Sequence, residues 1–161
     1  MVTVSDRVSG GRRADESGPA VAEVLQRHGF RVRETRVVPD ERANIEEVLR
    51  DLAASVPLVV TTGGTGLGRR DVTPEATLAV VGRVVPGLAE AMRAAGRSST
   101  PTADLSRGVV GVRGSSIIVN LPGSPKGAVE SLEAVLPTLP HALSEVAGSD
   151  SHHDASVHRA T

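Results

Sequence analysis

The residues best suited to chemistry lie in one stretch, 61–75, which reads TTGGTGLGRRDVTPE. Four glycines fall within six residues, so the backbone can approach a ligand closely and successive N–H groups can form a nest for an anion. Asp71 follows the glycines and suits Mg²⁺, which proteins usually hold through one or two carboxylates plus substrate phosphates. The alternative is a flexible loop in which Asp71 only stabilises the N-terminus of the helix that follows. The combination of glycines, arginines and an aspartate after an apolar segment favours a phosphate-binding loop.

Two well-known phosphate motifs do not describe this stretch. Gly63 and Gly68 have the separation of a Walker A loop, but Arg69 and Arg70 stand where Lys and Ser or Thr are required. The dinucleotide fingerprint fails at the same place, because its third glycine would have to stand at position 69. The two arginines can clamp phosphates or simply be solvated, and the sequence leaves both readings open.

Two other segments carry candidate binding residues. Asp40 follows an apolar, strand-like segment and can act as a second carboxylate beside Asp71. The turn Pro122-Gly123-Ser124-Pro125 precedes a helical pattern, with Ser124 as the expected N-cap, and a helix start of this kind attracts anions. A plain helix start is the alternative. Lys126, the only lysine of the chain, stands beside this turn.

Strand-like and helix-like segments alternate along the chain, which predicts an α/β fold. We expect three layers, α/β/α, around a mostly parallel sheet with one short antiparallel hairpin at Gly114. Expected strands are 2–5, 30–38, 57–61, 109–113 and 115–120. Expected helices begin near Ser17 and Thr73, each as N-cap, after Pro39-Asp40, at Pro86 and after Ser124. Either the first strand is short or the protein starts further upstream.

Ligands of open α/β sheets bind beyond the carboxyl ends of the strands. Asp40 and the glycine loops after Thr61 and Asn120 all follow strand ends. The order of the elements therefore predicts that they gather at one edge of the sheet.

Composition excludes several classes of protein. The chain has 161 residues, no Cys, Trp or Tyr, and a single aromatic residue, Phe30, with a net charge of -1. There is thus no disulfide framework, zinc knuckle or thiol nucleophile, and a nucleic-acid binder that stacks bases on aromatics is not expected. The longest apolar run, about five residues, is far too short to span a membrane. We expect a cytoplasmic enzyme or binding protein.

One domain accounts for most of the chain. We expect it to cover residues 1–147, followed by a disordered tail, 148–161, which is polar and without periodicity. The tail contains His152, His153 and His158, a residue type that can bind metal.

Together these segments resemble the Mog/MoaB family of molybdenum-cofactor biosynthesis proteins. The resemblance extends over residues 1 to about 147, and its most specific part is TTGGTG followed by RRDVTPE. It is also carried by Ser5-Asp-Arg-Val-Ser9, Asp15-Glu-Ser-Gly-Pro19, Pro39-Asp40, Pro86-Gly87, Leu105-Ser-Arg107 and Asn120-Leu-Pro-Gly-Ser-Pro125.

The resemblance implies a molybdopterin adenylyltransferase that uses Mg²⁺, ATP and molybdopterin and hands its product to a molybdenum-insertion protein. It implies a homotrimer, sometimes a hexamer. The composition, for its part, predicts no nucleic-acid or membrane partner. Asp40 and Asp71 match the family's two essential aspartates, which implies roles in catalysis and as metal ligands. The implied substrate-binding residues are Gly63, Gly64, Thr65 and Gly66 in the glycine loop, and Asp15, Ser17, Gly18, Pro122, Gly123 and Ser124 in the rest of the pocket.

Two other functions compete with this one. The first is a non-catalytic molybdopterin- or nucleotide-binding protein of the same fold. The second is a structural oligomerisation module, which would not need charged residues beside its glycine loops. The two aspartates favour the enzyme.

Overall fold

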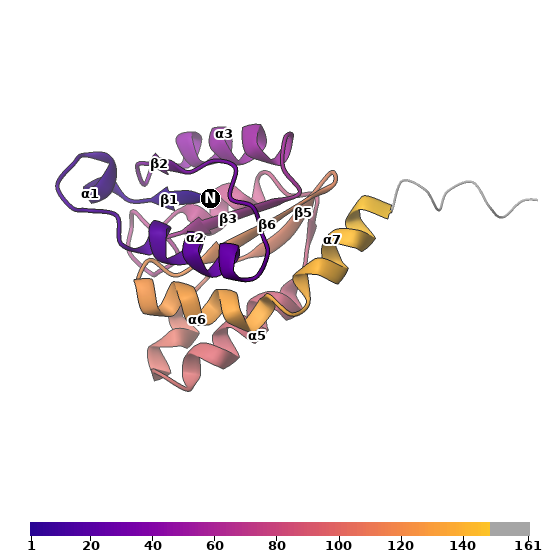
Figure 1. Cartoon of the computed structure of the whole chain (residues 1–161). Helices are drawn as coiled ribbons and strands as arrows, with labels where there is room; N and C mark the ends of the chain where they lie inside the picture. The colour runs from indigo at the N-terminus through magenta and orange to yellow at the C-terminus, as the bar shows by residue number, and fades with distance from the viewer. Residues whose placement is uncertain (149–161) are drawn as a thin grey trace, which may run out of the picture.

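A computed structural model describes residues 1–148 of the chain, and Figure 1 shows a sheet with helices on both faces. The helices are α1 Asp6–Ser9, α2 Ser17–Arg27, α3 Arg42–Ala53, α4 Thr73–Leu78, α5 Pro86–Arg97, α6 Pro125–Val135 and α7 Leu139–Gly148, with a 3₁₀ helix, η1, at Pro101–Leu105. The strands are β1 Val2–Val4, β2 Arg36–Val38, β3 Leu58–Thr62, β4 Arg83–Val84, β5 Val110–Arg113 and β6 Ser116–Leu121. The predicted three-layer α/β fold is confirmed.

The six strands form one sheet in the order β2-β1-β3-β6-β5-β4. The first four run parallel, and β5 and β4 are antiparallel to their neighbours. The β5–β6 hairpin turns at Gly114, whose φ of +54° is open to glycine at little cost, as the sequence predicts.

Alternate residues of the central strands face two separate apolar layers, as period-2 geometry requires. Val60 points to the layer of α2, α5, α6 and α7, while Val59 points to the layer of α3 and α4. Ile117 and Ile118 divide in the same way. Figure 1 shows α3 on one side of the sheet and α2, α6 and α5 on the other. Both faces of β3 and β6 are therefore covered, which explains their nearly continuous apolar sequence.

The predicted strand over 30–38 is wrong in its first part. Only Arg36–Val38 forms β2, because its partner β1 offers three residues, Val2 to Val4, in the paired register. Phe30 instead closes the end of α2, where its N–H donates to the carbonyl of Leu25 at 2.9 Å. Gly29 precedes it with a φ of +82°, the predicted end of that helix.

Two predicted N-caps are also wrong by one position. Glu16 is the N-cap of α2 and Val72 that of α4, so Ser17 and Thr73 are the first residues of their helices. The Thr73 hydroxyl donates instead to the carbonyl of Gly63 at 2.9 Å, a tertiary contact that sequence alone does not reveal. Ser124 does cap α6, accepting the N–H of Gly127 at 3.2 Å.

The short elements α1 and β4 escape prediction, because four and two residues carry no readable period. The expected tail begins at 148, but Gly148 is the last residue of α7. Residues 149–161, with the three tail histidines, lie outside the described residues. Within residues 1–148, no helix is long and apolar enough to cross a membrane.

Candidate active site

A cavity of about 250 Å³ opens at the carboxyl ends of the parallel strands. Its wall includes Ser5 after β1, Asp40 after β2, Gly63 after β3 and Gly123 after β6. Helix α2, between β1 and β2, and helix α3, after β2, cover opposite faces of the sheet. The cavity therefore lies where the winding direction changes, which is the usual ligand position in such folds. The predicted gathering of these segments at one edge is confirmed.

Asp40 is half-buried in this wall and is oriented by the backbone of α1. Its Oδ2 accepts the N–H of Asp6 at 2.7 Å, and its own N–H donates to Asp6 Oδ1 at 3.0 Å. Burial raises the pKa of the Asp40 carboxyl above its ordinary value, and the negative charges of Asp6 and Asp71 add to this effect. Arg70 donates to both oxygens of Asp6 and thereby lowers the pKa of that carboxyl.

Asp71 lines the same cavity and is packed against the glycine loop. Its Oδ2 accepts the N–H of Gly68 at 2.8 Å. A Cβ atom on Gly66 or Gly68 would lie 2.9 or 2.7 Å from this oxygen, so both positions need glycine to let the carboxylate approach. Among residues 1–148, Oδ1 of Asp71 and Oδ1 of Asp40 each accept no hydrogen bond. Two carboxylates with one unused oxygen each fit a hard divalent cation.

The glycine loop leaves three consecutive backbone donors unused. Gly63 and Gly64 have φ values of +99° and +65°, and a Cβ atom on each would meet the Val4 carbonyl oxygen and the Thr73 hydroxyl at 2.2 and 2.3 Å. The Gly63 N–H donates to Leu121, but the N–H groups of residues 64–66 donate no hydrogen bond within the described part of the chain. Unused successive N–H groups in left-handed and turn conformations suit an anion.

Asp15 is another carboxylate that lines this cavity. Its carboxylate accepts the Thr3 hydroxyl at 2.6 Å and the Gly18 N–H at 2.9 Å, which ties the start of α2 to β1. A Cβ on Gly18 would lie 2.3 Å from Asp15 Oδ2. Gly18 thus allows this packing, while Asp15 and Ser17 line the cavity itself.

The positive charges of the cavity are not the ones that the sequence suggested. Arg7 and Arg13 line it, whereas Arg69 and Arg70 do not. Arg70 is occupied by ion pairs with Asp6 and Glu41, each at 3.0 Å.

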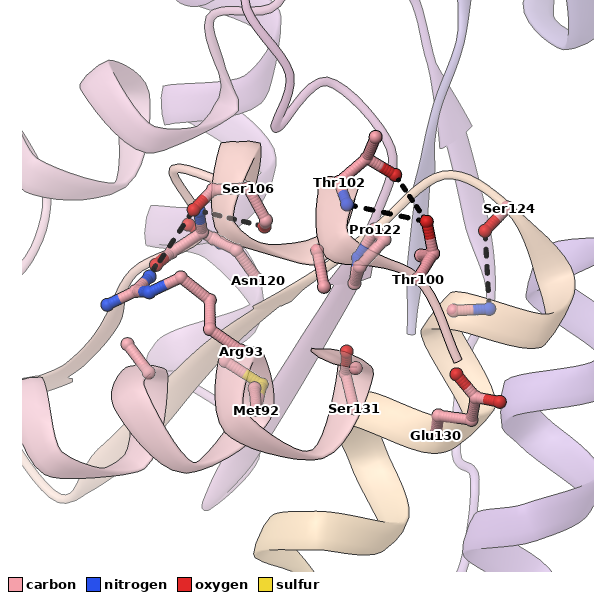
Figure 2. A pocket seen from close by; sticks show the side chains of 15 residues that line it. Met92, Arg93, Thr100, Thr102, Ser106, Asn120, Pro122, Ser124, Glu130 and Ser131 are labelled. Atoms are coloured by element: carbon pink, nitrogen blue, oxygen red, sulfur yellow. Dashed lines mark hydrogen bonds between the residues drawn. The ribbon is translucent and has the colours of Figure 1, made fainter. Parts of the chain in front are cut away.

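A second, smaller cavity of about 160 Å³ lies on the other side of the turn 122–125. Pro122 and Ser124 line the smaller cavity, while Gly123 and Pro125 line the larger one, so the two share this turn. Figure 2 shows Met92 and Arg93 in the smaller cavity, with Thr100 and Thr102 hydrogen-bonded to each other at its edge. Its lining combines apolar groups with hydroxyls and contains no aromatic ring.

Comparison with known proteins places this geometry in a family. Residues 1–141 match the model of a probable molybdopterin binding domain. The chain belongs to this molybdopterin-binding family. It is 49% identical to the molybdopterin adenylyltransferase of Escherichia coli K12 over 140 residues, which is 84% of this chain and 71% of that protein. It is 43% identical to the molybdopterin adenylyltransferase of Helicobacter pylori J99, over 92% of this chain and 87% of that protein.

A solved structure shares the fold as well. The crystal structure of the molybdopterin biosynthesis enzyme MoaB from Thermus thermophilus superposes with a TM-score of 0.87 and 56% identity, over 91% of this chain and 94% of that one. The predicted family is confirmed.

Within this molybdopterin-binding fold, the predicted site residues fall into three groups. Seven line the larger cavity: Asp15, Ser17, Asp40, Gly63, Gly64, Asp71 and Gly123. Two, Pro122 and Ser124, line the smaller cavity. Three lie behind the walls, with Thr65 buried, Gly66 against Asp71 and Gly18 against Asp15.

Sequence reasoning missed the cavity-lining Arg7 and Arg13 and the positioning contacts of Asp6. Arg7 and Asp6 belong to the segment 5–9, which the family resemblance singles out, so that segment was the available signal. Lys126, in contrast, is exposed and pairs only loosely with Glu130, at 3.7 Å.

Proposed function

We propose that this protein is a molybdopterin adenylyltransferase, which transfers AMP from ATP to molybdopterin and releases pyrophosphate. Relatives at 43–49% identity carry that name. The observation that carries the proposal is the pairing, in one cavity, of the Asp40 and Asp71 carboxylates with the glycine loop that follows β3.

Asp40 and Asp71 would hold Mg²⁺ through the Oδ1 atoms that accept no hydrogen bond within residues 1–148. The carboxylates that line the cavity outnumber its guanidinium groups by two, so polyphosphate would be repelled without a counter-ion. Bound there, Mg²⁺ would supply positive charge to the phosphates of ATP and to the leaving pyrophosphate.

The chain's own contribution is positioning. Gly64, which lines the cavity, would donate its unused N–H group to a phosphate oxygen, and Arg7 and Arg13 would offset the remaining charge. An oxygen of the terminal phosphate of molybdopterin attacks the α-phosphorus of ATP, and the bond from that phosphorus to the oxygen bridging to the β-phosphate breaks. The attacking phosphate is already ionised, so no protein nucleophile or base is required, and catalysis depends on alignment and electrostatics.

The smaller cavity offers a place for a heterocycle, the pterin or the adenine. It adjoins the larger cavity through the turn 122–125, and its lining has apolar groups such as Met92 beside hydroxyls such as Ser106. Phe30, the only aromatic residue, lines a different cavity near the start of β3 and is not available for stacking. Recognition of the ring would then depend on backbone groups, hydroxyls and the Asn120 side chain in the lining of the smaller cavity.

The surroundings of the reaction are part of the same proposal. We expect a homotrimer, or a hexamer built from it, and a molybdenum-insertion protein that consumes the adenylylated product. Since the reaction consumes ATP, we place it in the cytoplasm. The catalytic domain would be 1–147.

The test uses pure protein with molybdopterin, ATP and Mg²⁺, and follows adenylyl-molybdopterin by chromatography. Asp71→Asn should keep molybdopterin binding, because the amide oxygen can still accept the Gly68 N–H, and should lose Mg²⁺-dependent adenylylation. Asp104→Asn is the matched control, since Asp104 pairs with Arg97 outside the cavity and should leave turnover unchanged. Unchanged turnover in Asp71→Asn would exclude the proposed mechanism.

The alternative is a protein that binds molybdopterin or a nucleotide on the same fold without catalysis. The same experiment separates the two, because such a protein would bind the pterin and form no adenylylated product. The two unused carboxylate oxygens favour the enzyme.

A further inference from the structure

Arg107 joins three points of the loop that carries Asp71 to the helix α4 that follows it. It follows η1, outside the regular elements. Its backbone N–H donates to the carbonyl of Thr65 at 2.9 Å, its Nε to the carbonyl of Gly66 at 2.8 Å and its Nη2 to the carbonyl of Asp71 at 2.6 Å. Its Nη1 forms an ion pair with the Glu75 carboxylate.

These contacts restrain a segment that would otherwise be mobile. Glycines have the largest backbone freedom, and the carbonyls of a loop lack the regular hydrogen bonds of a helix or a strand. An ordered glycine loop therefore needs hydrogen-bond donors from other parts of the chain. A guanidinium offers its N–H groups in a rigid planar fork, whereas an ammonium is a point donor. Arg107 therefore holds the carbonyls of Gly66 and Asp71 at a fixed separation.

Asp71 is consequently held at two places. Arg107 binds its backbone carbonyl, and Gly68 binds its carboxylate through Oδ2. Arg107 does not line the larger cavity, so it is placed to act through Asp71 and the loop instead of on a ligand.

Glu75 keeps Arg107 in place. Burial raises the pKa of Glu75, but the hydrogen bond and the charge of Arg107 outweigh it, and the net pKa lies below the ordinary value. Glu75 Oε2 is buried and has no hydrogen-bond partner within the described residues, so this carboxylate depends on Arg107. The Arg107–Glu75 pair has no net charge, so the charge of the larger cavity is set by the residues that line it.

We propose that Arg107 is a positioning residue that fixes the loop 64–71 and orients Asp71 for metal binding. This proposal rests on the proposed function, because it assigns Arg107 a part in the same site.

The test compares Arg107→Ala and Arg107→Lys with Arg97→Ala. Arg97 is a matched control: it forms an arginine–carboxylate pair with Asp104 of η1 but contacts no carbonyl of the glycine loop. Residue-specific amide exchange provides a readout that needs no substrate. The N–H groups of Gly68, Asp71 and Thr73 are hydrogen-bonded within this loop, while the Gly63 N–H is held by Leu121.

In Arg107→Ala, the amides of Gly68, Asp71 and Thr73 should exchange about tenfold faster or more, while Gly63 stays unchanged. The Mg²⁺ concentration needed for half-maximal adenylylation should rise by about 10- to 100-fold, the usual effect of losing an outer partner of a metal ligand. Arg107→Lys keeps the charge opposite Glu75 and should fold normally, yet show the same direction of change in both measurements. Arg97→Ala should match the wild type.

Two outcomes would overturn the proposal. One is a lower melting temperature in Arg107→Ala with unchanged loop exchange and Mg²⁺ requirement, which would leave only a structural role. The other is full recovery of both measurements in Arg107→Lys, which would reduce the role to charge. A wild-type protein without adenylylation would contradict the proposed function, and the exchange rates would still decide the role of Arg107.

Discussion

Asp6 and Asp40 each accept the backbone N–H of the other, at 3.0 and 2.7 Å. This reciprocal pair joins the start of α1 to the segment after β2 and places two carboxylates side by side. Arg70 compensates Asp6 directly, through both carboxylate oxygens, and Asp40 only from a distance. Of the two carboxylates, Asp40 is therefore the one whose ionisation is unfavourable unless a cation binds beside it.

The first prediction concerns Asp40→Asn and pH. Since the folded-state pKa of Asp40 is raised, folding favours the protonated carboxyl, and this contribution is lost as pH rises through the folded pKa. At pH 7 without metal, the free energy of unfolding of Asp40→Asn should exceed that of the wild type by up to about 1 kcal/mol. The difference is small because solvent screens a half-exposed charge. The Asn oxygen can still accept the Asp6 N–H.

Urea denaturation of both proteins at pH 7 and near pH 3 checks this prediction. The difference should vanish at the lower pH, which lies below the ordinary Asp pKa of about 3.9, because the wild-type carboxyl is then protonated as well. Mg²⁺ should stabilise the wild type and not Asp40→Asn. A less stable Asp40→Asn at pH 7 would contradict the raised pKa.

A second prediction compares two glycines with positive φ. Gly64→Ala would place a Cβ 2.3 Å from the Thr73 hydroxyl and 3.2 Å from Asp40 Oδ1, while Gly114→Ala meets nothing within 4 Å. Both substitutions should cost about 1–2 kcal/mol for the left-handed backbone. Gly64→Ala should cost more and should also abolish adenylylation, because it displaces Thr73 or Asp40. Denaturation curves with activity assays test the pair, and equal activity in both variants would argue against a close-fitting loop.

Much of the fold was predictable from local patterns. The buried strand β3, the hairpin at Gly114 and the cap Ser124 follow from apolar runs, a glycine and a helix start, all of which are short-range features. The strand over 30–38 was overestimated because its length depends on β1, a segment more than 25 residues away along the chain. Pairing length is a tertiary property, and alternation of residue types cannot report it.

The gathering of the candidate segments was predictable, whereas the side chains that line the cavity were predictable only in part. Strand order alone places Asp40 and the glycine loops after Thr61 and Asn120 at one edge of the sheet. Which arginines face the cavity depends instead on the path of the loop 5–15 and on ion pairs with Asp6 and Glu41. Arg107 is 36 residues from Asp71 along the chain, and no spacing in the sequence connects them.

The third prediction separates Arg7 from Arg70. Arg70 is 57% exposed and pairs with Asp6 and Glu41 outside the cavity, so Arg70→Ala should change both the stability and the KM for ATP little. Arg7 lines the cavity, so Arg7→Ala should raise that KM about tenfold or more, because a hydrogen bond to a charged group contributes about 1.5–3 kcal/mol. Arg7→Lys should recover part of the loss, since it keeps the charge without the fork.

Initial rates at varied ATP concentration and fixed excess Mg²⁺ distinguish the two arginines, with the melting temperature of each variant measured alongside. The effect of Arg7→Ala should shrink as salt concentration rises, because added ions screen the attraction between the guanidinium and phosphate. If Arg70→Ala instead raised the KM and Arg7→Ala did not, Arg70 would have to leave its ion pairs with Asp6 and Glu41 when ATP binds. The assignment of the cavity's positive charge to Arg7 would then be wrong.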